Sequence, residues 1–165
     1  MDNEDTMEQF LTFTVSDESY ALNVNNVREV LEFTNISKVP RMPEFMRGII
    51  NLRGSIVPVI DMKMKFGLGK TEKTIATSIV VCELLMDEET IVMGLLTDSV
   101  QEVIDLDSND IEPTPYVGAR IDTSFILGMG KRGDEFIIIL NMQKILTSGE
   151  ISEISKSGEK EKLAE

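Results

Sequence analysis

The sequence predicts an all-β fold in which two similar small barrels pack against each other. Its apolar residues fall in short segments separated by turn-forming residues, with no long amphipathic helix between them, a pattern typical of a barrel or a sandwich. The same order of segments occurs twice along the chain, which favours two related units. The apolar content is mainly aliphatic, because the 165 residues include seven Phe, two Tyr and no Trp.

The first two strands are predicted to form a hairpin. Residues 9–15 alternate between apolar and polar side chains, as expected for a strand with one buried face. The polar segment 16–19 turns the chain, and residues 20–24 return as a second strand.

A second apolar region covers residues 48–60 and is interrupted at Arg53-Gly54-Ser55. Pro58 lies inside this region and has no N–H to donate to a ladder, which predicts an edge or bulge position. Asp61 follows directly and is expected to cap a short helical turn that runs through Phe66.

The second half is predicted to repeat these elements. Residues 74–86 and 90–97 form a probable hairpin, and residues 105–116 are polar with two prolines, which predicts a loop. Residues 136–140 form an uninterrupted apolar strand, followed by a short helix at 142–146. The lone Cys82 lies in an apolar strand segment and is interpreted as a buried, unreactive thiol.

Two stretches of the first half align without gaps with two stretches of the second half. Residues 20–31 match 93–104, and residues 45–66 match 125–146. The identical pairs of the first alignment are Leu22 and Leu95, Val27 and Val100, Glu29 and Glu102, and Val30 and Val103. We infer an internal duplication, and we expect the groove between the two barrels to be a natural place for a partner.

The expected domain covers residues 8–147, with repeats of roughly 8–70 and 75–147 whose strands can be exchanged between the sub-barrels. Residues 148–165 are rich in Gly, Ser, Glu and Lys, which predicts a mobile or weakly helical acidic tail.

Charge and composition exclude several classes of function. The net charge of −13 repels phosphate backbones and anionic lipid headgroups, which disfavours nucleic-acid binding. The chain has no His and one Cys, so a histidine base, a histidine metal site and a thiolate zinc site are excluded. We therefore expect no enzyme activity, no catalytic residue, no cofactor and no metal. The sequence contains neither a signal peptide nor an apolar stretch that could span a membrane, and we expect a cytoplasmic protein.

Residues 48–61 closely resemble the signature segment of the CheW family of chemotaxis coupling proteins. They read Gly-Ile-Ile-Asn-Leu-Arg-Gly-Ser-Ile-Val-Pro-Val-Ile-Asp. Residues 9–13, 98–103 and 125–130 are also similar to that family, and the match extends in collinear order over 8–147.

The resemblance implies a fold of two pseudo-repeated, five-stranded SH3-like β-barrels with short helical turns. It also implies an adaptor that couples the regulatory domain of the histidine kinase CheA to the cytoplasmic tips of methyl-accepting chemoreceptors. Such an adaptor is cytoplasmic and is recruited to membrane-associated receptor arrays. We expect a monomer in isolation, without direct membrane insertion.

Arg53 is the first candidate for partner binding, because its planar guanidinium suits bidentate pairing with a carboxylate. By resemblance it belongs to the segment that supports receptor and kinase coupling. The alternative is an ion pair with Glu29 that supports the fold, and the sequence leaves both roles open. The second half keeps Glu102 but has Gly133 where Arg53 stands, so Arg132 is the expected substitute.

The sequence also leaves the roles of the other candidate partner-binding residues open. Val27, Glu29 and Val30 resemble a family segment tied to partner binding, yet both valines could be core residues. Gly48 is expected to provide a special backbone angle in a region that the family places near the receptor contact. Asn51 could cap a turn or contact a partner.

Three rival functions remain at the level of the sequence, and an enzyme is the third of them. The first is an adaptor of the same fold that serves a non-flagellar chemosensory pathway, which nothing in the chain distinguishes. The second is a small barrel that binds nucleic acid, which the acidic charge and the low aromatic content disfavour.

Overall fold

The computed structural model describes residues 6–86, 88–113 and 124–146. The predicted tail at 148–165 lies outside these residues. The strands are β1 (Met7–Val15), β2 (Glu18–Asn23), β3 (Val27–Glu32), β4 (Met46–Leu52), β5 (Ser55–Asp61), β6 (Ser78–Met86), β7 (Glu89–Thr97), β8 (Ser99–Asp107), β9 (Ile126–Arg132) and β10 (Glu135–Leu140). The helical turns are η1 (Val24–Asn26), α1 (Met62–Lys65), η2 (Ser108–Asp110) and η3 (Met142–Lys144).

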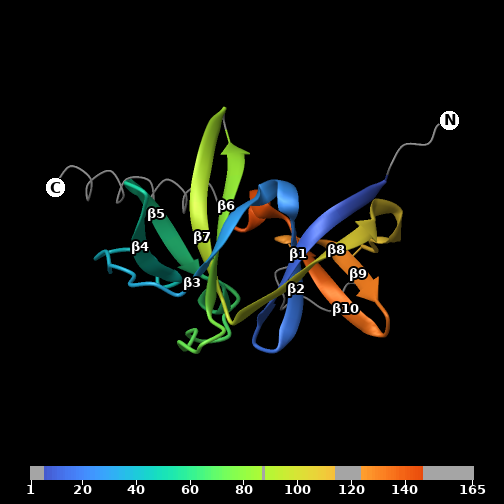
Figure 1. Ribbon diagram of the computed structural model, residues 1–165, viewed down its shortest axis with the longest axis horizontal. Coiled ribbons are helices and arrows are strands. Elements are labelled where there is room, and N and C mark those ends of the chain that lie inside the picture. The colour runs from blue at the N-terminus through green and yellow to red at the C-terminus, as the bar shows by residue number, and fades with distance from the viewer. Residues whose placement is uncertain (1–5, 87, 114–123, 147–165) are drawn as a thin grey trace.

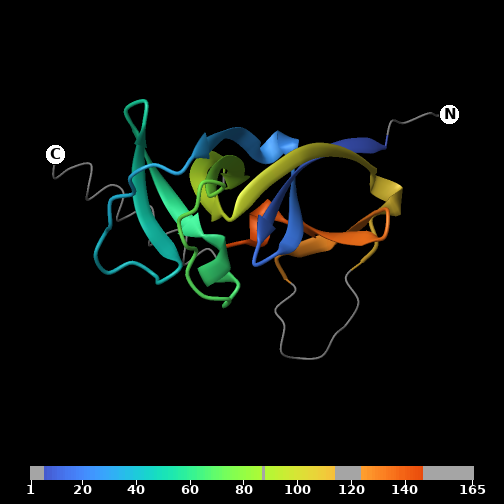
Figure 2. The same ribbon diagram turned by 60° about the horizontal axis from the view of Figure 1, so that its bottom comes forward.

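The strands form two five-stranded sheets that lie side by side along the long axis (Figures 1 and 2). Sheet A has the order β8-β1-β2-β10-β9, and sheet B has the order β3-β6-β7-β5-β4. This arrangement confirms the predicted all-β fold of two five-stranded, SH3-like barrels.

Each sheet combines strands from both halves of the chain. Strands β1 and β2 from the first half join β8, β9 and β10 in sheet A, while β6 and β7 from the second half join β3, β4 and β5 in sheet B. In Figure 1 the dark blue β2 therefore lies beside the orange β10, and the teal β5 lies beside the yellow-green β7. Neither half alone contains a complete sheet.

The pairing within the two sheets is equivalent strand by strand. The hairpin β1–β2 corresponds to β6–β7, and the parallel pair β2–β10 corresponds to β7–β5. The remaining antiparallel pairs also correspond: β1–β8 to β6–β3, and β10–β9 to β5–β4. The two sheets thus share one pairing pattern, as a duplication would produce.

Local sequence signals account for the elements at the end of the first repeat. Strand β5 pairs with β7 only from Val59 onward, so Pro58 has a neighbouring strand on one side only, as its missing N–H predicts. Asp61 then caps α1, because its Oδ1 accepts hydrogen bonds from the N–H groups of Lys63 at 3.1 Å and Met64 at 3.4 Å.

Two expectations about the second half need correction. Residues 105–107 continue strand β8, and residues 108–110 form η2, so the predicted loop at 105–116 begins later than expected. Its last residues, 114–116, lie outside the described part. The strand predicted at 74–86 begins at Ser78, because Thr74 and Thr77 form a local turn in which the Thr74 N–H donates to Thr77 Oγ1 at 2.7 Å.

The largest core cluster contains buried residues of both sheets. It includes Phe13 and Leu22 of sheet A together with Ile60, Cys82 and Leu95 of sheet B. Two smaller clusters of buried residues each belong to a single sheet, one to sheet B and one to sheet A. The junction between the barrels is therefore packed core, and the groove expected there stays a prediction for the surface of this junction.

A run of stacked aromatic rings crosses the junction. Tyr20 of β2 lies between Phe13 and Phe66, with ring centroids 6.0 and 5.0 Å apart, and Phe66 stacks on Phe125 at 5.0 Å. Offset stacking of this kind adds about 1 kcal/mol per pair beyond area burial. Burial also raises the pKa of Tyr20, with a smaller contribution from Glu18. The stack attaches the end of α1 to sheet A.

Gly48 and its repeat equivalent Gly128 occupy sites of close backbone approach. A Cβ on Gly48 would lie 2.1 Å from the carbonyl oxygen of Ser37, and one on Gly128 would lie 2.7 Å from that of Glu112. The backbone segments beside the two glycines are hydrogen-bonded in the same way. Next to Gly48, the Ile49 N–H donates to the carbonyl oxygen of Ser37 at 2.8 Å. Gly48 also has φ +148°, which confirms the expected special backbone angle.

We predict that Gly48→Ala lowers the free energy of unfolding by about 3 kcal/mol or more, because the new Cβ overlaps a backbone oxygen. Gly67→Ala is the matched control, since Gly67 has φ +75° but no atom within 4 Å of the added Cβ. We expect Gly67→Ala to lower the free energy of unfolding by about 1 kcal/mol, which is the cost of a left-handed backbone conformation for a residue with a Cβ. Urea unfolding followed by circular dichroism measures both, and equal losses would contradict the steric argument.

Cys82 is fully buried, as predicted, and burial raises its pKa to about 12. We predict that the native thiol resists alkylation at pH 8 and reacts only after unfolding. Because the unfolded thiol ionises near its usual pKa of 9.0, Cys82 also contributes stability that is lost as the pH rises from about 9 toward 12. Alkylation followed by mass spectrometry with and without denaturant tests this, and rapid native labelling would disprove it.

Candidate functional site

The predicted partner-binding residues all lie on the two edge strands of sheet B or on the turn beside them. Val27, Glu29 and Val30 belong to β3, whereas Gly48 and Asn51 belong to β4, and Arg53 lies in the turn between β4 and β5. Strands β3 and β4 are the opposite edges of sheet B. The sheet therefore has to curve to bring residues of these two strands, which are distant in the sequence, close together.

An ion pair between Arg53 and Glu29 connects these two edges. Arg53 Nη2 pairs with Glu29 Oε2, and Nη1 donates to Oε1 at 3.3 Å, so the contact is bidentate. The Arg53 side chain is 71% exposed and that of Glu29 is 26% exposed. The ion pair that the sequence left open is therefore present, with the guanidinium facing solvent.

The hairpin turn fixes where Arg53 stands. Leu52 pairs with Ser55, which leaves a two-residue turn, and its members Arg53 and Gly54 have φ +50° and +88°. Positive φ at both positions is the type I′ geometry that matches strand twist. Asn51 Oδ1 accepts a hydrogen bond from the Gly54 N–H at 2.9 Å. Of its two predicted roles, Asn51 therefore has the turn-capping one in this structure.

The second repeat contains the equivalent ion pair. Arg132 at the end of β9 pairs with Glu102 of β8, and these strands are the two edges of sheet A. Arg132 therefore takes the place of the missing arginine at Gly133, as expected from the duplication. Both barrels are bridged at their open edges by an Arg–Glu pair.

The other candidates differ in accessibility. Val30 is 42% exposed, whereas Val27 is half-buried and packs against the core cluster between the sheets. Gly48 is buried beneath Ser37 and can influence a partner only through the backbone that it shapes. Val30 and Arg53 are thus the candidates whose side chains a partner can reach most directly.

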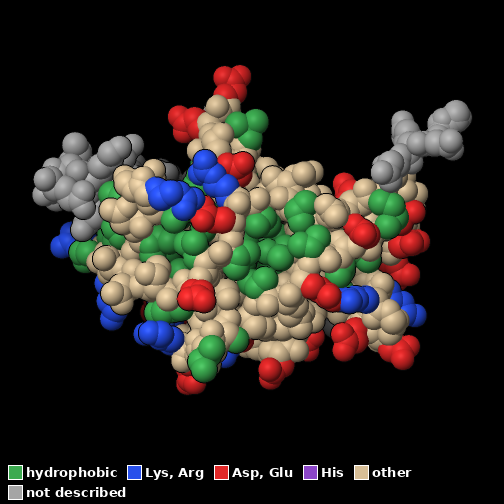
Figure 3. Space-filling view, in the orientation of Figure 1, with side chains coloured by type: hydrophobic (Ala, Val, Ile, Leu, Met, Phe, Trp, Pro, Cys, Tyr) green, Lys and Arg blue, Asp and Glu red, His purple; other side chains and the backbone are tan. Residues whose placement is uncertain are grey.

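Apolar side chains also gather on the face where β3, β1 and β8 come together (Figure 3). Val103 of β8 is 51% exposed and is the repeat equivalent of Val30. Our sequence analysis did not select Val103 as a site residue, although the alignment of the repeats placed it opposite Val30. Contiguous exposed apolar surface is typical of interaction sites, so Val103 becomes a further candidate.

Comparisons with known proteins agree with this description. A family model for the CheW-like domain matches residues 9–150. The chemotaxis protein CheW of Klebsiella aerogenes is 29% identical over 148 residues, covering 88% of this chain and 85% of that protein. CheW of Helicobacter pylori is 30% identical over 145 residues, covering 88% and 84%. The crystal structure of the scaffolding protein TtCheW from Thermoanaerobacter tengcongensis has a TM-score of 0.77 at 37% identity, covering 91% of this chain and 94% of that chain.

The family match and the related scaffolding protein place this two-barrel chain in the class of chemotaxis scaffold or adaptor proteins. The chain belongs to the CheW-like family of chemotaxis proteins. Within the described part of the chain, no helix is long and apolar enough to span a membrane.

We predict that Arg53→Ala lowers the free energy of unfolding by less than about 1 kcal/mol, because exposed ion pairs contribute little in water. Arg47→Ala provides the contrast. Arg47 Nη1 lies 3.0 Å from Oδ2 of Asp61, a carboxylate that is only 1% exposed, and its loss is expected to cost about 3 kcal/mol or more. Urea unfolding compares the two variants, and a large loss for Arg53→Ala would assign Arg53 to fold support.

Proposed function

We propose that this protein couples the histidine kinase CheA to the cytoplasmic tips of methyl-accepting chemoreceptors. The observation that carries the proposal is the pair of equivalent barrel edges, each with an Arg–Glu ion pair beside an exposed valine. An adaptor has to hold two partners at once, and this fold offers one such edge on each barrel.

The two edges differ in the residues that a partner would meet. Sheet B presents Arg53 in an Arg-Gly turn, whereas the corresponding turn of sheet A is Gly133-Asp134. Because the two barrels have similar folds but different turn residues, each barrel can select its own partner. The resemblance to the CheW family implies that one partner, the regulatory domain of CheA, has the same barrel fold.

Arg53 is the proposed anchor of the sheet B edge. A guanidinium has five N–H donors, and the two contacts to Glu29 leave donors that face solvent. These donors suit a carboxylate or a carbonyl on the partner, with Val30 supplying adjacent apolar contact. Glu29 holds the guanidinium in place before the partner arrives, which lowers the entropy lost on binding.

The remaining parts of the proposal follow from the same role. The protein acts in the cytoplasm, is recruited to membrane-associated receptor arrays through its partners, and is a monomer when isolated.

We predict that Arg53→Glu weakens assembly with kinase and receptor by about 30-fold or more, the size of a hot-spot contact. An immobilised receptor cytoplasmic fragment receives the kinase with each variant, and kinase recruitment and autophosphorylation are measured. Circular dichroism verifies folding. Lys144→Glu carries the same charge change in the exposed part of η3 and is expected to behave as wild type.

The double variant Arg53→Glu with Glu29→Arg separates the two roles of the pair. It restores an ion pair between the edges but places the guanidinium on the other strand. Coupling that stays lost supports direct contact by Arg53, whereas full recovery would assign the pair to fold support. If the wild-type protein binds neither partner, the coupling proposal fails.

A further inference from the structure

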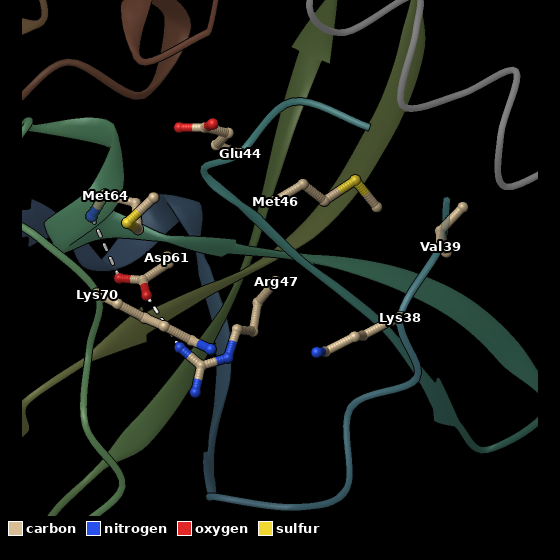
Figure 4. Close-up of a pocket in the computed structure, with 8 residues that line it drawn as sticks. All are labelled: Lys38, Val39, Glu44, Met46, Arg47, Asp61, Met64 and Lys70. Carbon is tan, nitrogen blue, oxygen red and sulfur yellow. Dashed lines mark hydrogen bonds and ion pairs between the residues drawn. The ribbon is translucent and has the colours of Figure 1, made fainter. Parts of the chain in front are cut away.

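A pocket of about 460 Å³ lies on the outer part of sheet B, beside β4, β5 and α1. Three cationic side chains line it, Lys38, Arg47 and Lys70, and Met64 contributes an apolar wall. Figure 4 shows the heads of Lys38 and Lys70 directed toward the guanidinium of Arg47, while Glu44 lies on the far side. Such a concentration of positive charge is unexpected in a chain of net charge −13.

Arg47 already has a structural partner. Its Nη1 lies 3.0 Å from Asp61 Oδ2 and also donates to the carbonyl oxygen of Thr71 at 3.0 Å. Thr71 binds the same carboxylate, with its N–H 2.9 Å from Oδ2 and its Oγ1 2.6 Å from Oδ1. The charges of Arg47 and Asp61 therefore cancel within the protein.

Lys38 and Lys70 are not explained by this network. Both are exposed, and neither forms an ion pair with any residue that the structure describes. Two ammonium groups that converge beside a guanidinium repel one another unless an anion lies between them. After Arg47 and Asp61 cancel, these lysines leave two positive charges at one side of the pocket and Glu44 one negative charge at the other, so the lining has a net charge of +1.

The second repeat shows whether the fold requires charged residues at the positions of Arg47 and Asp61. The equivalents of Arg47 and Asp61 are Leu127 and Asn141. Asn141 still caps the following turn, because its Oδ1 accepts a hydrogen bond from the Gln143 N–H at 3.1 Å. The turn is therefore built without a charged pair, and the Arg47–Asp61 pair has no charged counterpart at the equivalent positions of the second repeat.

We propose that this pocket binds a small phosphate-bearing anion. The ammonium groups of Lys38 and Lys70 have no ion-pair partner among the described residues, and they can donate charge-assisted hydrogen bonds to the oxygens of a phosphate anion. The volume suits a small organic phosphate, and Met64 lies where its carbon body would rest. The phosphate is either free or part of a monoester. The inference stands on this pocket and does not depend on the coupling role.

The test is calorimetric titration of the isolated protein at pH 8 and constant ionic strength. Inorganic phosphate and phosphoserine are the two probes, and chloride provides the blank. We expect saturable binding of phosphate, and tighter binding of phosphoserine identifies a monoester as the preferred source. Equal affinities identify the free anion. Absence of saturable binding by both probes overturns the proposal.

The double variant Lys38→Gln with Lys70→Gln is expected to weaken binding by about tenfold for each lysine, because a hydrogen bond to a charged group contributes about that factor. The control, Lys131→Gln with Lys144→Gln, changes the net charge equally at exposed positions of β9 and η3. It is expected to change the affinity less than twofold. If both double variants lose the same affinity for phosphate, overall charge explains the binding and the proposed site is wrong.

Discussion

The exchange of strands between the two halves of the chain is the constraint on which the rest of this structure depends. Sheet A needs β8, β9 and β10 from the second half, and sheet B needs β3, β4 and β5 from the first. Neither sheet can be completed before both halves have been brought together. The main core cluster lies at their junction, so burial of apolar surface stabilises the pairing of the barrels and not only each barrel separately.

This constraint also determines where the functional surface lies. Exchange leaves each barrel with two edge strands, and exposed edges invite pairing with other chains. In both barrels an Arg–Glu pair connects the edges, although exposed pairs of this kind add little stability. Their contribution is to hold charged groups in fixed positions beside the exposed Val30 and Val103. Under the proposed function, the edges would accept partners that match this charge and apolar pattern.

Local elements could be predicted from the sequence, whereas the choice of strand partners could not. The first hairpin and the Asp61 cap follow from alternation and capping chemistry, which act over a few residues. Strand β3 alternates in the same way whether it pairs within its own half or with β6, so periodicity does not select the partner. Similarly, Glu29 and Arg53 were chosen by residue type, but Lys38 and Lys70 come to line one pocket only in the folded chain.

Comparison of the repeats separates what the fold requires from what function has added. Gly48 and Gly128 are both enforced by a neighbouring carbonyl oxygen, and Asp61 and Asn141 both cap a helical turn. These shared features satisfy steric and hydrogen-bonding demands of the backbone. By contrast, the charge at Arg47 and Asp61 belongs to the first repeat alone, although the second repeat folds without it. Burying that carboxylate and its partner costs desolvation energy. The fold does not require this cost, because the second repeat caps the equivalent turn with the neutral side chain of Asn141.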